Sequence, residues 1–414
     1  EIYNFQQLKS LLTEYRFITN SDTEVLLALY IKFGHSCIEK LKGQFSLAIW
    51  DANDKSLFIA RDRLGEKPFF YNLSNGVFIF ASELKSLCTS KLIDIDISKR
   101  SILDLLVHES VKSPKTIIDN VFQLPPGSYA LVKNGMLSIT QYWSAGCASK
   151  VFFEEKYDIV CKNINRLLIK SLEEQIISDV PLGAFLSGGI DSSLLVALMS
   201  KFSSRPVKTL SVIFNSKKFD ESLYSREIAR LYKTDHHEIK LNNDDLLSDV
   251  IDYLDIMDMP SGDGFNSFVV SKAARNAGLT VALSGIGGDE LFAGYRPFKW
   301  FERYMKYNFF WKLPRESRRF VGFIINRMRT KESKLSRLLS LPHASPIDFY
   351  NLVRSCYSVS DAEKILDQYS SSVNEKGLLY GAELNSQNLL PIFSQYSVLE
   401  LNNYTRNVLL KDTD

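Results

Sequence analysis

The stretch Val180-Pro-Leu-Gly-Ala-Phe-Leu-Ser-Gly-Gly-Ile-Asp-Ser-Ser193 carries the most informative local pattern in the chain. Leu182 to Leu186 is a short apolar run suited to a central strand, and Ser193 to Met199 has apolar residues at helical spacing. Between these runs, Ser187 to Gly189 has no bulky side chain where the backbone must bend. The stretch therefore predicts a buried strand, a glycine turn and a helix.

Such a turn lies at a helix N-terminus, where free backbone N–H groups and the helix dipole attract an anion. The hydroxyls of Ser187, Ser192 and Ser193 can add hydrogen bonds to a phosphate. Asp191 would repel a phosphate unless a hard cation such as Mg2+ lies between them, so we assign Asp191 to a metal. An ordinary strand-to-helix connection is the alternative, and a Ser/Gly turn alone would favour it.

No lysine follows the glycines, which excludes the nucleotide loop G-x-x-x-x-G-K-[ST]. The loop instead resembles the pyrophosphate loop of the ATP-pyrophosphatase superfamily, whose members split ATP between the α and β phosphates and adenylate a carboxylate or carbonyl oxygen. The resemblance implies that ATP or pyrophosphate is bound by Leu186, Ser187, Gly188, Gly189, Ile190, Asp191 and Ser192.

Length and composition bound the class of protein. The chain has 414 residues, too many for one ordinary core, and its 45% hydrophobic and 24% charged content is that of a soluble globular protein. A net charge of +2 gives no reason to expect nucleic acid, and no apolar stretch is long enough to suggest a membrane partner. Five scattered cysteines indicate a reducing cytoplasm. Because the chain opens on Glu1 and a helical pattern runs almost to Asp414, we expect both ends to be missing.

Residues 1–145 show short strand patterns separated by turns, with a closing hairpin across Lys133-Asn-Gly135, and they predict a sheet-rich first domain. Several segments resemble, in order, the glutaminase domain of glutamine-hydrolysing asparagine synthetases: 1–4, 21–24, 43–51, 60–68, 124–128 and 142–143. In that family a first-residue cysteine of an N-terminal nucleophile domain attacks the glutamine amide. None of the five cysteines holds that position, so we expect this chain not to hydrolyse glutamine.

The same resemblance implies roles for two acidic residues of the first domain. Glu1 would help to hold glutamine, and Asp22 would bind its α-amino group. The alternative for Asp22 is a helix cap, because Ser21-Asp-Thr-Glu24 precedes an amphipathic helix.

Residues 146–414 form the second predicted domain, with a crossover at 144–160. Strands alternate with helices there, which predicts a doubly wound parallel sheet covered on both faces, with extra helices toward the end of the chain. A second glycine loop, Ser284-Gly-Ile-Gly-Gly-Asp-Glu290, also follows a buried strand. Both loops then lie at strand carboxyl ends, where open α/β sheets bind ligands, and Asp191 and Asp289 could share one Mg2+. For Asp289 and Glu290 the alternative is a favourable interaction with the helix dipole.

The resemblance implies further contacts with the nucleotide and with the acceptor substrate. The backbone at Ser284 and Gly285 would contact AMP, and Val212 with Leu186 would line the adenine pocket, although both apolar residues suit an ordinary core equally well. Ile286 departs from the acidic residue that asparagine synthetases place near the acceptor. Asp263 is an acceptor or metal candidate, with a turn-forming role as its alternative.

From the resemblance we expect an ATP- and Mg2+-dependent ligase. It would adenylate an acceptor carboxylate, most simply aspartate, and aminate it with ammonia from glutamine, and it could form a homodimer. Two alternatives stay open: another acceptor, such as a sugar acid, a peptide or a β-amino acid, and a non-catalytic nucleotide-binding homologue. The lysine that stabilises the adenylation transition state in the family falls in no segment of this chain, so we expect an incomplete catalyst.

Overall fold

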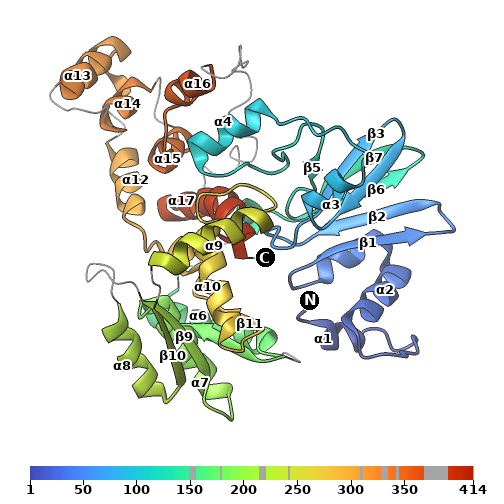
Figure 1. Ribbon diagram of the computed structural model, residues 1–414. Coiled ribbons are helices and arrows are strands. Elements are labelled where there is room, and N and C mark those ends of the chain that lie inside the picture. The colour runs from blue at the N-terminus through green and yellow to red at the C-terminus, as the bar shows by residue number, and fades with distance from the viewer. Residues whose placement is uncertain are drawn as a thin grey trace.

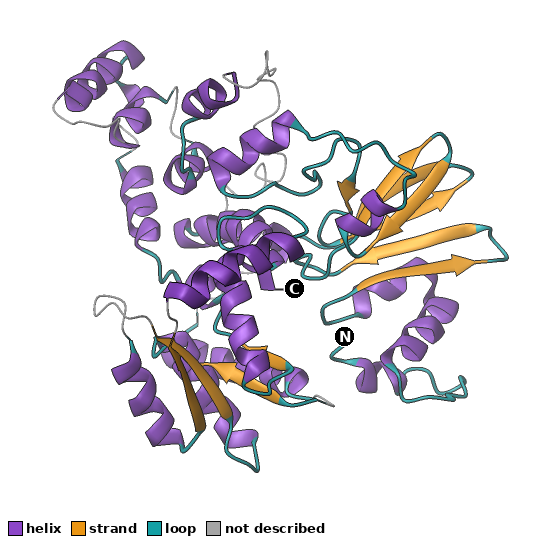
Figure 2. Cartoon of the chain, in the orientation of Figure 1, coloured by secondary structure: helices purple, strands orange, loops and turns teal. Residues whose placement is uncertain are grey.

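The computed structural model describes residues 1–148, 155–177, 180–213, 221–240, 243–307, 311–327, 334–341, 345–367 and 390–413 (Figure 1). Two antiparallel sheets form the first half of the chain, and a parallel sheet with many helices forms the second (Figure 2). The predicted fold class, a sheet-rich domain followed by a doubly wound α/β domain, is confirmed. The domain boundary at 145 stays a prediction, and residues 149–154 of the predicted crossover lie outside the described residues.

The larger antiparallel sheet has the strand order β1-β2-β6-β7 and the smaller has the order β4-β3-β5. Their strands are β1 Ser46–Asp51, β2 Ser56–Arg61, β3 Phe70–Ser74, β4 Val77–Ala81, β5 Phe122–Gln123, β6 Ser128–Lys133 and β7 Met136–Gln141. The predicted hairpin joins β6 to β7, and Asn134 and Gly135 both have positive φ, which matches the twist of the strands. Helices of this half are α1 Phe5–Lys9, α2 Asp22–Phe33, η1 Gly34–Lys40, α3 Leu84–Thr89 and α4 Lys99–His108.

The core of the first half lies between α2 and the larger sheet. Val25 and Leu29 of α2 are buried together with Phe58 and Ala60 of β2. Each is less than 2% exposed, so the helix and the sheet exclude water from one common apolar layer. This packing leaves the N-terminal end of α2 beside Glu1 and Ile2, at the rim of the sheet.

The second half is built on the parallel sheet β10-β9-β8-β11, with β8 Leu182–Phe185, β9 Lys208–Ile213, β10 Asp235–Lys240 and β11 Val281–Leu283. The chain places β9 and β10 successively on one side of β8, and then places β11 on its other side. The strand order therefore reverses between β8 and β11. Such a reversal opens a crevice at the strand carboxyl ends, where ligands bind in doubly wound folds.

Helices cover both faces of this sheet, as predicted. On one face, Leu172 and Val196 pack with Ala184 of β8. On the other, Ala273 and Ala274 pack with Leu210 of β9. The helices of this region are α5 Ala145–Ala148, α6 Tyr157–Gln175, α7 Ile190–Phe202, α8 Ser222–Tyr232, α9 Asn243–Ile256, α10 Gly264–Asn276 and α11 Gly288–Phe292.

A further group of helices lies beside the sheet and ends the described chain (Figure 1). These are α12 Arg296–Lys306, α13 Arg315–Arg327, α14 Lys334–Ser340, α15 Pro346–Arg354, α16 Val359–Asp367, α17 Ile392–Glu400, the π-helix η4 Leu401–Leu409 and the 3₁₀ turn η5 Lys411–Thr413. An aromatic core joins α12 to α17, where the Phe298 and Tyr396 rings are 4.6 Å apart between centroids. In the described part of the chain, none of the helices has the length and apolar character that crossing a membrane requires.

Candidate nucleotide and metal site

The first glycine loop follows β8 directly. Leu186 continues the strand, because its backbone N–H donates to the Leu210 carbonyl at 2.8 Å. The Ser187 hydroxyl then lies 3.0 Å from the Ser192 hydroxyl and accepts from the Gly189 N–H at 3.2 Å. These bonds bend the chain into the first turn of α7, which begins at Ile190, three residues earlier than the sequence pattern predicts. Asp191 is thus the second residue of that helix.

Gly188 requires the absence of a side chain. Its φ is +85°, and a Cβ there would lie 2.7 Å from the Tyr224 Cβ and 2.9 Å from the Ser225 backbone nitrogen. Both neighbours are backbone or near-backbone atoms at the start of α8, which cannot rotate away. The first glycine loop is therefore enclosed between the N-terminal turns of α7 and α8.

The second glycine loop follows β11 and rests on the first. A Cβ at Gly285 would lie 3.0 Å from the Asp191 Cβ and 3.1 Å from the Ser192 backbone nitrogen. A Cβ at Gly288 would collide with the Asp191 carboxylate itself. The structure thus brings Asp191 directly against the residue that precedes Asp289, and the sharing of one Mg2+ by the two aspartates stays a prediction.

The electrostatics of this contact favour a cation. Burial and then the negative charges of Asp289 and Glu290 raise the pKa of Asp191 above its ordinary value. The Asp289 carboxylate lies against Gly294, at the far end of the short helix α11. Among the described residues, no group of three or more His, Cys, Asp or Glu side chains is arranged to hold a metal. Two aspartates fit Mg2+, which usually takes its remaining ligands from water and substrate phosphates.

The residues predicted to contact the nucleotide differ in solvent exposure. Ile190 is 86% exposed, whereas Leu186 is fully buried and packs in the core with Leu172 and Val196. Val212, in β9, is half-buried, and the Ser284 hydroxyl lies 3.5 Å from the Ile286 N–H in an exposed turn. The roles of these residues toward ATP stay predictions. The packing of Leu186 is that of an ordinary core residue, which was the alternative to a place in the adenine pocket.

Glu1 and Asp22 lie together in the first half. Both line one cavity of about 1130 Å³, together with Gln44 and Trp50. The Asp22 carboxylate accepts from the Ile2 N–H at 3.0 Å. The cap alternative for Asp22 is wrong, because Ser21 is the N-cap of α2 and accepts from the Thr23 N–H. Binding of glutamine by this pair stays a prediction.

Among the described residues, no hydrogen bond or ion pair joins the two acceptor candidates. Ile286 is 39% exposed in the second glycine loop. Asp263 lies at the start of α10, where its carboxylate accepts from the Asn266 side chain at 2.8 Å and its carbonyl accepts from the Asn266 N–H. Both bonds are those of the turn-forming alternative.

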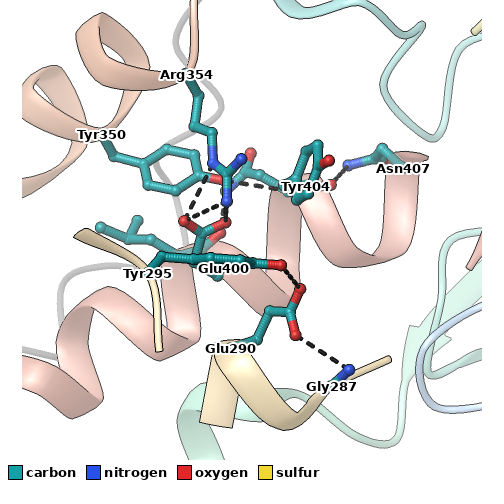
Figure 3. Close-up of polar contacts among 10 residues, drawn as sticks. Gly287, Glu290, Tyr295, Tyr350, Arg354, Glu400, Tyr404 and Asn407 are labelled. Carbon is teal, nitrogen blue, oxygen red and sulfur yellow. Dashed lines mark hydrogen bonds and ion pairs between the residues drawn. The ribbon is translucent and has the colours of Figure 1, made fainter. Parts of the chain in front are cut away.

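A polar network behind the second glycine loop was not expected from the sequence. It runs from Glu290 and Tyr295 to Arg354 and Glu400 (Figure 3). One local signal existed, because Glu290 stands three residues after Gly287, the spacing at which an acidic side chain reaches back to a helix start. Arg354 and Glu400 carry no such signal, since they meet only through tertiary packing.

Comparison with known proteins identifies the family of the chain. The sequence matches a glutamine amidotransferase domain over residues 1–143 and asparagine synthase over residues 163–412. The chain belongs to the asparagine synthase family. The resemblance noted in the sequence is thereby confirmed.

Three curated relatives illustrate the range of this family. The putative glutamine-hydrolyzing asparagine synthetase 2 of Methanocaldococcus jannaschii is 36% identical over 71% of this chain and 58% of its own. The glutamine-hydrolyzing asparagine synthetase 1 of Bacillus subtilis is 34% identical over 72% of this chain and 47% of its own. Amidase chry2 of Gibberella zeae is 28% identical over 72% of this chain and 47% of its own. The chain spans about half the length of the curated relatives it matches.

Proposed function

We propose that the protein is a glutamine-dependent carbon–nitrogen ligase that uses Mg2+ and ATP to adenylate a carboxylate, with aspartate as the first candidate acceptor. The observation that carries the proposal is the contact between the two glycine loops at the reversal of strand order, where Asp191 rests on Gly288. Adenylation would activate the carboxylate, because AMP is a good leaving group, whereas a free carboxylate offers no good leaving group to an attacking ammonia.

The chain's own groups fit that reaction. The N-terminal turns of α7 and α8 present backbone N–H groups and positive dipole ends to a phosphate chain. Asp191 and Asp289 would hold Mg2+, which would neutralise the charge of the departing pyrophosphate. In the first half, the cavity beside Glu1 and Asp22 would bind glutamine as the source of ammonia.

The test is an assay of the products formed from ATP. With Mg2+, an ammonium salt as the source of ammonia and a panel of carboxylates, we expect AMP and pyrophosphate in a one-to-one ratio, because ammonia displaces AMP from the adenylated acceptor, and we expect aspartate to be the best acceptor. Formation of ADP and phosphate instead, or no acceptor dependence at all, would contradict the proposal. Asp158→Asn is a matched control for variants of Asp191, because Asp158 is likewise the second residue of a helix but lies on the exposed α6.

A second candidate keeps adenylation and changes the acceptor. Ile286 favours it, because an isoleucine can neither accept a proton nor bind an ammonium group at the exposed rim of the second loop. A relative described as an amidase is also consistent with chemistry other than asparagine synthesis in this family. In the same assay, pyrophosphate release with a sugar acid or peptide and none with aspartate would select this candidate.

A further inference from the structure

The second glycine loop is held from behind by Glu290, the third residue of α11. One oxygen of this carboxylate accepts from the Gly287 N–H at 3.0 Å, and the other accepts from the Tyr295 hydroxyl at 2.9 Å (Figure 3). Glu290 is only 1% exposed, so these two bonds replace the water that a free carboxylate would have. The backbone of the loop at Gly287 is therefore fixed through Glu290 to the Tyr295 hydroxyl.

Tyr295 is in turn fixed by Arg354, at the end of α15. The guanidinium carbon lies 5.2 Å from the centroid of the Tyr295 ring and 3.8 Å from that of the Tyr404 ring. A planar guanidinium suits such contacts with two rings, and a lysine ammonium does not. Arg354 thus connects the second glycine loop to the π-helix η4, which contains Tyr404.

The orientation of Arg354 is set by Glu400, the last residue of α17. Arg354 donates to both Glu400 oxygens at 2.8 Å, and the Tyr350 hydroxyl donates to one of them at 3.2 Å. Glu400 is fully buried, and burial raises its pKa while Arg354 opposes that rise. Loss of Arg354 would leave an uncompensated charge in the interior, so the pair holds a single geometry.

We propose that Arg354 and Tyr295 are positioning residues of the ligase site. Through Glu290 they hold the second glycine loop so that Gly288 supports the Asp191 carboxylate at the start of α11. The proposal rests on the proposed function for what the loop binds, but not for how the loop is held. Neither residue needs to touch ATP.

The test uses two variants with matched controls. Tyr295→Phe keeps the ring on Arg354 and removes only the hydroxyl that donates to Glu290. Arg354→Lys keeps the charge and removes the planar fork. Tyr357→Phe and Arg319→Lys are the controls, because Tyr357 and Arg319 are exposed and lie outside the network.

Hydrogen exchange measured by mass spectrometry tests the positioning directly. We expect exchange of the amides in 284–295 to speed up about tenfold in both variants and in neither control. The Mg2+ concentration needed for half-maximal ATP binding should rise about fivefold or more in the same two variants. A purely structural role would lower thermal stability without shifting that Mg2+ requirement.

The outcomes separate the two proposals. Unchanged exchange in 284–295 for Tyr295→Phe would overturn the positioning role, and so would an altered loop with an unshifted Mg2+ requirement. Failure of the wild-type protein to bind ATP with Mg2+ would overturn the proposed function, and exchange would then decide the positioning alone. If Arg354→Lys does not fold, Tyr295→Phe still decides, because it removes a single oxygen.

Discussion

Asp191 is placed where its own charge is unfavourable. Its carboxylate rests on Gly288, close to the negative charges of Asp289 and Glu290, and burial together with those charges raises its pKa. A carboxyl group whose pKa is raised in the folded protein contributes stability below its unfolded value, near 3.8, and loses it as the pH rises through the folded pKa. At neutral pH the ionised Asp191 therefore lowers the stability of the free protein, and a bound cation would offset this loss.

At the residue scale we predict that Asp191→Asn stabilises the free protein at pH 7. The midpoint of thermal unfolding should rise by about 1–2 °C, a modest effect because the group is partly exposed, and the gain should disappear near pH 4. Differential scanning calorimetry without Mg2+ measures both. Asp158→Asn controls for the lost interaction with a helix N-terminus and should give no gain. A lower midpoint for Asp191→Asn at pH 7 would show that its charge is not repelled.

At the element scale, helix α3 shows how the two halves of the chain depend on each other. Glu83, its N-cap residue, makes no side-chain cap. Instead Asp258, which precedes α10 in the second half, accepts from the Leu84 N–H at 2.6 Å and from the Lys85 N–H at 2.8 Å. A short helix has few internal bonds, so this cap from a distant segment contributes much of its stability.

We predict that Asp258→Ala lowers the free energy of unfolding, measured by urea titration, by about 1–2 kcal/mol, the usual effect of removing a helix cap. Asp255→Ala is the matched control. Asp255 contacts Lys85 only through its backbone carbonyl, which the substitution keeps. Equal unfolding free energies for the two variants would contradict the cap.

At the scale of the whole molecule, the sequence predicts the features that local patterns encode and misses those that depend on long-range contacts. The strand, turn and helix around Ser187 to Asp191 follow from apolar spacing and glycine, which are local signals, and so does the hairpin at Asn134-Gly135. The neighbourhood of β8 and β11 is different, because the pairing of Ala184 with Leu283 joins residues about a hundred positions apart. No local pattern encodes that register, and the sequence predicted only that both loops follow buried strands.

The same limit explains the contacts that were missed. The Gly262 N–H donates to the Glu109 carbonyl at 2.8 Å, and Ser110 forms a β-bridge with Ser261, so main-chain bonds join the first half to the loop before α10. Main-chain bonds leave no side-chain signature in the sequence. The ion pair of Arg354 and Glu400 cannot be predicted from the sequence either, because the strength of the interaction depends on burial that only the assembled fold creates.

The central claim is that Asp191 binds Mg2+ together with ATP between the two glycine loops. Isothermal titration calorimetry of ATP into the protein, with and without Mg2+, tests it most directly. We predict that the wild-type protein and Asp158→Asn bind ATP equally well when Mg2+ is present, and that Asp191→Asn weakens this binding at least about tenfold. Equal Mg2+-dependent affinity in Asp191→Asn and the wild-type protein would contradict the claim.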